Sequence, residues 1–206
     1  MIIGSAITED IVRQDPRYVN KKTITLSDIS AYALEQQSVN STEALKKVNA
    51  MKEEYGNGIS ALVRIYNASG EAVSLAETND WHGHIWKYPV DTIIENGQWS
   101  VFLYVHASSA AVGVCSAVVY RAAQAEQDIF LGWESPYIGN NSVYVESRET
   151  NHWPNVGSWN YMEHKINDDA GSSSSSKWGV IKVTGQIGQS SSPVVDFVIT
   201  HPREER

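Results

Sequence analysis

From Ile59 to Thr200 the chain repeats one pattern: short runs rich in Val, Ile, Tyr and Trp, separated by clusters of Gly, Asn and Ser. Runs of this length between turn residues are typical of antiparallel strands. Both faces of the stretch Trp99–His106 are apolar, so it should lie in the middle of a covered sheet. We therefore predict a mainly β fold, an antiparallel β-sandwich. The predicted strands are Ile59–Tyr66, Ala72–Ala76, Trp99–His106, Cys115–Tyr120, Asp128–Trp133, Ser142–Glu149, Trp178–Thr184 and Val194–Thr200.

The remaining parts of the chain are predicted to be helical or irregular. Residues 1–22 show no sustained periodicity and should form an irregular arm. Residues 23–56 carry apolar side chains at helical spacing in two stretches, which predicts two helices. The serine-rich stretch Gly171–Ser176 is expected to be a flexible loop tip. The result is one domain, residues 1–206, in which an N-terminal helical hairpin precedes a sandwich over residues 59–200.

The helix boundaries are predicted from capping residues. Thr25, followed three residues later by Asp28, forms a partial capping box at the start of the first helix. A second start signal, Asn40 or Ser41, follows within the same segment, and Gly56 should end the second helix. The first helix should end near Gln37, and the two helices together form the predicted hairpin.

Charge argues against a nucleic-acid partner. The formal net charge is -8 and the isoelectric point is near 5.2. Binding to a phosphate backbone requires clustered Lys and Arg, and the chain has no basic stripe. No nucleic acid is therefore expected among its partners.

The N-terminus and the single cysteine together indicate a compartment. Met1 to Asp10 lacks the basic start and long apolar stretch of a secretory signal, and no run reaches the length of a membrane span. Cys115 has no partner for an intramolecular disulfide, which fits a reducing compartment. Its apolar neighbours suggest a buried, inert thiol. We predict a cytoplasmic protein without a cofactor.

One polar cluster could carry chemistry. His82 and His84 flank Gly83 and would share a face if all three lay in one strand, with His106 as a third metal ligand. The alternative is that these are loop histidines making ordinary hydrogen bonds. No motif of a nucleophile elbow, phosphate loop or dinucleotide site is present. The sequence predicts no catalytic residues, no metal site and no enzyme.

Aromatic side chains next to loops suggest a binding surface. Large rings can stack on sugars or hold a choline-type cation. Each ring could instead seal an end of the sandwich, but for the group we expect some at a ligand surface. The predicted ligand-binding residues, including neighbouring polar side chains and a proline, are Trp81, His82, His84, Trp86, Trp133, Pro136, Tyr137, Tyr144 and Trp153.

A series of segments between about Thr23 and Val183 carries a family resemblance. These segments include Asp28–Ala33, Tyr55–Ile59, Ile65–Gly70, Asp80–Ile85, Asn96–Trp99, Ala117–Arg121, Trp133–Tyr137 and Val143–Tyr144. In this order they resemble the jasmonate-induced 23 kDa protein family of plants. The resemblance implies a stress or defence protein of plant type.

The succession of segments from Ala117 through Pro136-Tyr137 to Val145 carries a second resemblance, in layout. It is similar to that of the actinoporins and aegerolysins, β-sandwich cytolysins that recognise lipid headgroups. In actinoporins the segment corresponding to Pro136-Tyr137 continues with an aspartate and an aromatic loop that holds phosphocholine. Here Ile138 and Gly139–Asn141 stand in their place, so the sandwich can be shared without the same ligand.

Three hypotheses of function follow. The first is a defence protein that recognises a lipid headgroup on a membrane surface, after release from the cell, and permeabilises the membrane as a homo-oligomer. The second is a cytosolic lectin-like module that binds a glycan with the same rings, with His82 and His84 contacting sugar hydroxyls. The third is a metalloenzyme built on His82, His84 and His106. The first ranks highest and the third lowest.

Overall fold

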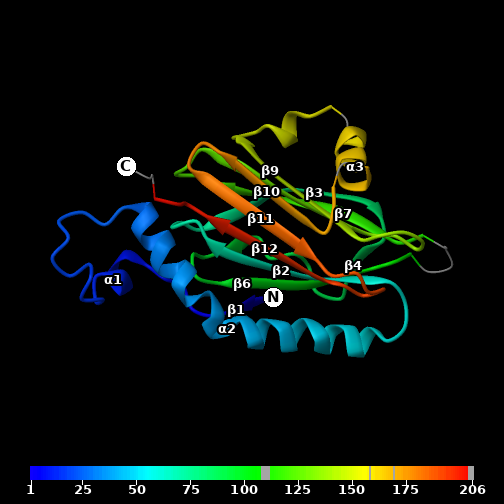
Figure 1. The fold of residues 1–206 in the computed structure, drawn as a ribbon, viewed down its shortest axis with the longest axis horizontal. Coiled ribbons are helices and arrows are strands. Elements are labelled where there is room, and N and C mark those ends of the chain that lie inside the picture. Colours follow the sequence, from blue (N-terminus) through cyan, green and yellow to red (C-terminus); the bar gives the residue numbers. More distant parts are fainter. Residues whose placement is uncertain (108–111, 158, 169, 204–206) are drawn as a thin grey trace.

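The protein is a sandwich of two β-sheets with helices on both outer faces (Figure 1). The computed structural model describes residues 1–107, 112–157, 159–168 and 170–203. The larger sheet contains, in spatial order, β1 (Ile2–Ile3), β6 (Trp99–Val105), β2 (Ser60–Ala68), β12 (Val194–Thr200), β11 (Ile181–Ile187) and β10 (Ser173–Trp178), with β4 (His84–Trp86) also paired to β6. The smaller sheet contains β5 (Ile93–Ile94), β3 (Val73–His82), β7 (Val114–Ala122), β8 (Gln127–Ser135) and β9 (Ser142–Glu149).

The main core lies between the two sheets. Val63 of β2, Phe102 of β6, Tyr120 of β7 and Phe197 of β12 are buried there. Because alternate residues of a strand face opposite sides, each sheet contributes every second residue to this layer. The predicted sandwich is confirmed. Six of the eight predicted strands match an observed strand closely, β3 extends beyond its prediction, and β11 starts later than expected.

One pairing departs from the predicted antiparallel arrangement. β2 and β12 run parallel, with Leu62 opposite Val194 and Ala68 opposite Thr200. The two strands lie far apart in the sequence, so no short turn constrains their relative direction. Arg64 strengthens this pairing, because its guanidinium donates to both carboxylate oxygens of Asp196 at 2.7 and 2.8 Å.

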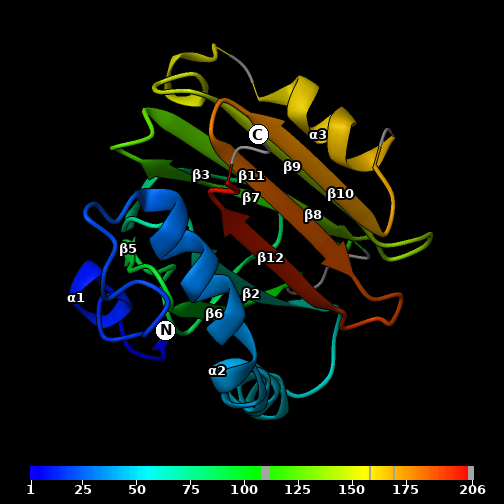
Figure 2. The ribbon, with the colours of Figure 1, turned by 60° about the vertical axis from the view of Figure 1, so that its left-hand side comes forward.

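The predicted helical hairpin is wrong, because residues 26–55 form one continuous helix, α2 (Leu26–Tyr55). Its ends were predicted correctly: Thr25 and Asp28 form a capping box, and Gly56 is the C-cap. The helix bends as it crosses the larger sheet (Figures 1 and 2). None of the described helices is long and apolar enough to cross a membrane.

The bend in α2 has an identifiable cause. Three side chains of the sheet donate hydrogen bonds to carbonyls of the helix. The Tyr66 hydroxyl donates to Ala33 at 2.6 Å, and the Trp99 indole N–H donates to Gln37 at 3.3 Å. The Arg64 guanidinium donates to the carbonyl of Ser41 at 3.1 Å. Side-chain donors that insert into the helical hydrogen-bond ladder bend a helix without ending it.

Two further predictions need correction. The arm of residues 1–22 is not wholly irregular, because it contains β1 and the short helix α1 (Glu9–Val12). The serine-rich stretch is not a loop tip, because Ser173–Trp178 form strand β10, paired with β11. The Ser174 and Ser176 hydroxyls accept hydrogen bonds from backbone N–H groups of β9, and this pairing outweighs the low strand propensity of the segment.

The outer face of the smaller sheet is covered by a 3₁₀ turn, η1 (Trp153–Asn155), and by α3 (Asn160–Asn167). Met162 and Ile166 of α3 are fully buried against this face. The turn η1 and the helix α3 therefore cover the outer face of β8 and β9 close to the candidate site.

Candidate functional site

An apolar pocket of about 280 Å³ lies at one end of the sandwich, where β7 begins and β8 ends. We call it the end pocket. Three of its residues are exposed apolar side chains: Val112 at 36%, Tyr137 at 61% and Ile138 at 87% exposure. Large apolar side chains on a protein surface often mark a binding site when they gather around a pocket. The full lining is His82, Val112, Gly113, Val114, Glu134, Pro136, Tyr137 and Ile138.

The loop that carries Tyr137 and Ile138 is anchored at its far end. Asn141 is 6% exposed, and its amide nitrogen donates to the carbonyls of Gly188 and Ser190, both at 2.8 Å. The Gln189 side chain completes the clamp by accepting from the Asn141 N–H and donating to its carbonyl, both at 3.0 Å. The two exposed side chains are therefore presented from a fixed base.

The near end of the same loop is held by close backbone packing. A Cβ atom on Gly113 would come within 2.0 Å of the Ser135 carbonyl oxygen and 2.5 Å of the Pro136 Cα. Only glycine lets the strand entering β7 approach so closely. Gly113 thus brings Val112 alongside the Pro136–Ile138 segment.

Two polar residues that line the pocket, His82 and Glu134, belong to one row of residues across the smaller sheet. His82 pairs with Cys115, Cys115 with Glu134, and Glu134 with Ser142. Residues directly opposite each other in a sheet share a face, so these side chains point toward α3. The His82 Nε2 atom lies 3.5 Å from a carboxylate oxygen of Glu163 on α3.

Glu134 carries an unusual carboxyl group. Burial raises its pKa, and the nearby carboxylates of Glu163 and Asp168 raise it further, against the lowering effects of Ser142 and His82. A half-buried carboxylate in an apolar pocket is costly when ionised. Glu134 therefore gives the pocket a negative group that an added cation would stabilise.

The raised pKa of Glu134 predicts a change in the pH dependence of stability. A carboxyl group whose pKa is higher in the folded state contributes stability at low pH and loses it as pH rises through the folded-state pKa. The side chain introduced by Glu134→Gln cannot ionise, so the substitution removes this loss of stability at higher pH. We expect the variant to melt a few degrees above the wild type at pH 7 and at the same temperature near pH 4.

Differential scanning calorimetry from pH 4 to pH 8 would measure this difference. Glu53→Gln, at an exposed position of α2, is the matched control and should follow the wild type throughout. An equal gain for Glu134→Gln at both ends of the pH range would mean that packing, not charge, causes the effect.

Cys115 is fully buried and free, as predicted from its neighbours. Burial raises the pKa of its thiol, and the carboxylates of Glu134 and Glu163 raise it further. A thiol that is both inaccessible and difficult to deprotonate is a poor nucleophile.

Of the ligand-binding residues predicted from sequence, the structure brings His82, Pro136 and Tyr137 together in the end pocket. Trp133 and Trp153 need correction, because both rings are completely buried. Trp133 packs between the sheets against Phe102 and Tyr104, and Trp153 packs against Phe130 beneath the outer layer. Neither ring can contact a ligand without unfolding of its surroundings.

The other predicted residues are half-buried or lie on other surfaces. Trp81 packs against Trp159 in a tilted arrangement, with ring centroids 6.2 Å apart, and Tyr144 packs edge-on against Phe130 at 6.1 Å. Trp86 packs on Tyr55 at 5.9 Å, on the side of the larger sheet that α2 covers. These rings pack against other side chains of the outer layers. Their role is therefore structural, which was the alternative to ligand binding.

The histidine cluster does not form as the metal hypothesis requires. Gly83 has φ +88° and directs the chain from β3 in one sheet to β4 in the other, so His82 and His84 do not share a strand face. His106 lies beside Gly58 and Tyr55. Within the described ranges, no three His, Cys, Asp or Glu side chains gather closely enough to hold a metal ion.

Sequence reasoning missed five residues that line the end pocket: Val112, Gly113, Val114, Glu134 and Ile138. Ile138 could have been found, since an isoleucine between Pro136-Tyr137 and a Gly-Asn-Asn turn has no strand in which to be buried. Glu134 gave no such signal, because its surroundings depend on α3, which packs over β8 from a distant part of the sequence.

Comparisons with known proteins agree in pointing to one family. A family model described as "Nakanori-like protein" matches residues 3–202. The 23 kDa jasmonate-induced protein of Hordeum vulgare is 40% identical over 187 residues, which cover 87% of this chain and 88% of that protein. The crystal structure of the lipid binding protein Nakanori superimposes with a TM-score of 0.94 at 34% identity, over 97% of this chain and all of that one. The resemblance found from sequence segments is thus confirmed.

Proposed function

Because this chain belongs to the Nakanori-like protein family, we propose that it is a lipid-binding protein that docks on a membrane surface through the end pocket. The observation that carries the proposal is the pair of exposed apolar side chains, Tyr137 and Ile138, held on an anchored loop beside a pocket. A relative that matches nearly the whole chain binds lipid, which supports the same activity here. The protein would act by binding and not by catalysis.

Tyr137 and Ile138 suit the boundary between water and acyl chains. An isoleucine side chain gains about 1.5–3 kcal/mol when its surface is fully removed from water. A tyrosine ring has an apolar body and a polar tip, and such rings favour the headgroup level of a bilayer. Val112 extends the same apolar edge on the other side of the pocket.

The pocket itself fits a cationic part of a headgroup. The Glu134 carboxylate supplies a negative charge in a half-buried setting, and the face of the Tyr137 ring attracts a quaternary ammonium. An anionic headgroup would be repelled by Glu134 and by Glu163 behind it. We therefore propose choline lipids as the preferred ligands.

We propose that α2 stays docked while the protein is bound, so that binding does not require a pore. The helix buries Ala33, Ala44, Val48 and Met51 against the larger sheet. Detachment would expose these residues and would break the three hydrogen bonds from the sheet to the helix carbonyls. If α2 were to permeabilise a membrane, its contacts with the bilayer would have to compensate for the lost packing and the lost hydrogen bonds.

A role in plant-type stress or defence is part of the proposal. It rests on the jasmonate-induced relative, whose name describes when that protein is made. No feature of the described surface favours a glycan over a lipid. A glycan array is therefore a counter-test: strong and selective glycan binding without lipid binding would replace the proposal by the lectin-like hypothesis.

Co-sedimentation with vesicles tests the proposal directly. We expect binding to vesicles of phosphatidylcholine or sphingomyelin, with and without sterol, and weaker binding when phosphatidylglycerol replaces the choline lipid. Glu134→Gln should reduce this preference for choline lipids because it removes the negative charge of the pocket. Vesicles that enclose a fluorescent dye should stay intact. Absence of binding to every composition would overturn the lipid proposal, and dye release would overturn the docked helix.

A further inference from the structure

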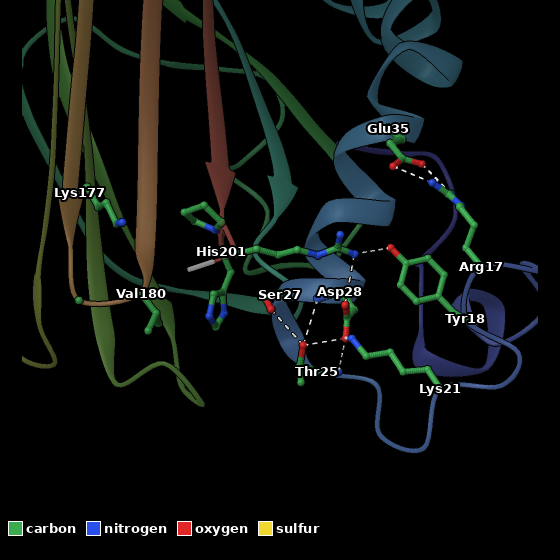
Figure 3. A pocket seen from close by; sticks show the side chains of 13 residues that line it. Arg17, Tyr18, Lys21, Thr25, Ser27, Asp28, Glu35, Lys177, Val180 and His201 are labelled. Carbon is green, nitrogen blue, oxygen red and sulfur yellow. Dashed lines mark hydrogen bonds and ion pairs between the residues drawn. The ribbon is translucent and has the colours of Figure 1, made fainter. Parts of the chain in front are cut away.

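A second and larger pocket, of about 720 Å³, lies beside the first turn of α2. Its walls come from four separate segments: the arm before α2, the helix start, the β10–β11 hairpin and the residues after β12 (Figure 3). We call it the cationic pocket. Its charged lining residues are Arg17, Lys21, Asp28, Glu35, Lys177 and Arg203.

The cationic pocket and the end pocket lie at opposite ends of the sandwich. Gln127, the first residue of β8, accepts hydrogen bonds from the backbone N–H groups of Val180 and Ile181 near the cationic pocket. Ser135, the last residue of β8, borders the end pocket. A nine-residue strand spans about 27 Å, so a ligand in one pocket cannot reach the other.

Positive charge exceeds negative charge in this pocket, in contrast to the chain as a whole, which has a formal net charge of -8. Four cationic side chains line it against two carboxylates, and a third carboxylate, that of Asp15, pairs with Arg17 from just outside the lining. Asp28 is shared by two of the cations, with Lys21 Nζ at 2.5 Å from one carboxylate oxygen and Arg203 Nη2 at 3.2 Å from the other. One carboxylate therefore neutralises only one of the two charges.

Asp28 keeps its charge over the whole physiological range. Burial alone would raise its pKa, but hydrogen bonds from Lys21 and Thr25 lower the pKa to about 2. The partial neutralisation by Asp28 is thus fixed, and so is the surplus of positive charge that remains.

Lys177 adds charge from the opposite wall. In Figure 3 it stands on the same side as Val180, across from Arg17, Tyr18 and Lys21. It makes no ion pair among the described residues and lies directly opposite Lys182 in the β10–β11 ladder. Two like charges in facing positions destabilise a sheet and raise the local positive potential, which a bound anion would relieve.

The guanidinium of Arg203 is already oriented toward the pocket. One of its nitrogens donates to the Tyr18 hydroxyl at 2.7 Å, and the group lies 5.9 Å from the centre of the Tyr18 ring. A guanidinium held in this way loses little conformational freedom when it binds an anion. Arg17 is held more fully, by both Asp15 and Glu35, and contributes less free charge.

We infer that the cationic pocket binds a phosphate monoester, with Lys177 on one wall and Lys21 and Arg203 on the other supplying the positive charge. A phosphate monoester offers three strong acceptor oxygens, so it can accept from cations on both walls at once more readily than a carboxylate, which offers two. The volume exceeds that of inorganic phosphate and is in the range of pockets for small organic ligands. Val180 and Pro202 offer apolar surface for the organic part. The ester could be soluble or part of a lipid headgroup.

Isothermal titration calorimetry at low ionic strength tests the inference. The probes are inorganic phosphate and glycerol 3-phosphate, together with vesicles of phosphatidylcholine with and without phosphatidic acid. We expect the wild type to bind the soluble ester with an affinity that falls as salt is added. Lys177→Gln should weaken this binding about tenfold, since it removes a charge-assisted contact from an exposed side chain.

Two further proteins make the result specific. Lys46→Gln removes an equal charge from an exposed position of α2 outside the pocket and should bind like the wild type. The variant Tyr137→Ser, Ile138→Ser alters only the end pocket and should also keep phosphate binding, which separates this site from the proposed lipid function.

Each outcome of these titrations either supports or overturns the proposed phosphate site. Binding of the soluble ester that depends on Lys177 supports a soluble ligand. Lys177-dependent binding of phosphatidic acid vesicles alone supports the site with a lipid as its source. Absence of binding to all probes, or equal binding by Lys177→Gln and the wild type, overturns the inference.

Discussion

Replacing Tyr137 and Ile138 together by serine is expected to weaken binding to choline-lipid vesicles about 100-fold. The two side chains are 61% and 87% exposed in the free protein, so their apolar surface is available for transfer into the bilayer. A combined loss of about 3 kcal/mol is reasonable for a tyrosine and an isoleucine that are only partly inserted. This free energy corresponds to the stated change in the dissociation constant. Co-sedimentation over a range of lipid concentrations measures it.

The control is a variant with the same substitutions at exposed positions away from the end pocket. Tyr161 on α3 is 44% exposed and Ile93 on β5 is 53% exposed. Tyr161→Ser, Ile93→Ser removes apolar surface of the same kind and should bind vesicles like the wild type. If both double variants lost binding equally, general surface hydrophobicity would explain the interaction and the end pocket would lose its role.

The strands of this protein were predictable because their pattern is local. β9 and β12 were predicted with the correct bounds, since both contain runs rich in β-branched and aromatic residues and turn residues flank them. The parallel pairing of β2 and β12 was not predictable, because it joins segments about 130 residues apart. The Arg64–Asp196 ion pair that accompanies it has no signature within either strand.

The errors in the fold arose where tertiary contacts override local preference. Asn40 and Ser41 are common helix caps, yet they lie inside α2 because the helix is held on both sides of its bend by Tyr66, Trp99 and Arg64. Serines 173 to 176 have low strand propensity, but both neighbouring strands supply hydrogen bonds to them. In both places the deciding groups are distant in the sequence.

The candidate site was predicted in part for a similar reason. Pro136 and Tyr137 follow a strand and precede a Gly-Asn-Asn turn, so their exposure could be inferred locally. The exposure of Trp133 was predicted wrongly, although the alternation of residues within β8 indicates that its side chain is buried. Ile129 and Leu131 face the core between the sheets, and Trp133 follows at the same spacing of two. Glu134 then falls on the outer face, under α3.

This alternation has a large consequence for Trp133. Trp133→Ala is expected to lower the free energy of unfolding by about 3–5 kcal/mol, because it leaves a cavity between the sheets where the indole now packs against Phe102, Tyr104 and Phe197. Vesicle binding should fall only in proportion to the unfolded fraction. Urea denaturation, followed by vesicle binding scaled to the folded protein, would measure both effects.

Trp133→Phe separates the packing of the ring from its polar group. The buried indole N–H of Trp133 has no hydrogen-bond partner among the described residues, and phenylalanine removes this cost while it keeps most of the apolar volume. The loss of stability should therefore be less than half of that for alanine. Lower vesicle affinity per folded molecule in either variant would mean that Trp133 takes part in binding, which its burial argues against, whereas unchanged affinity would assign it to the core.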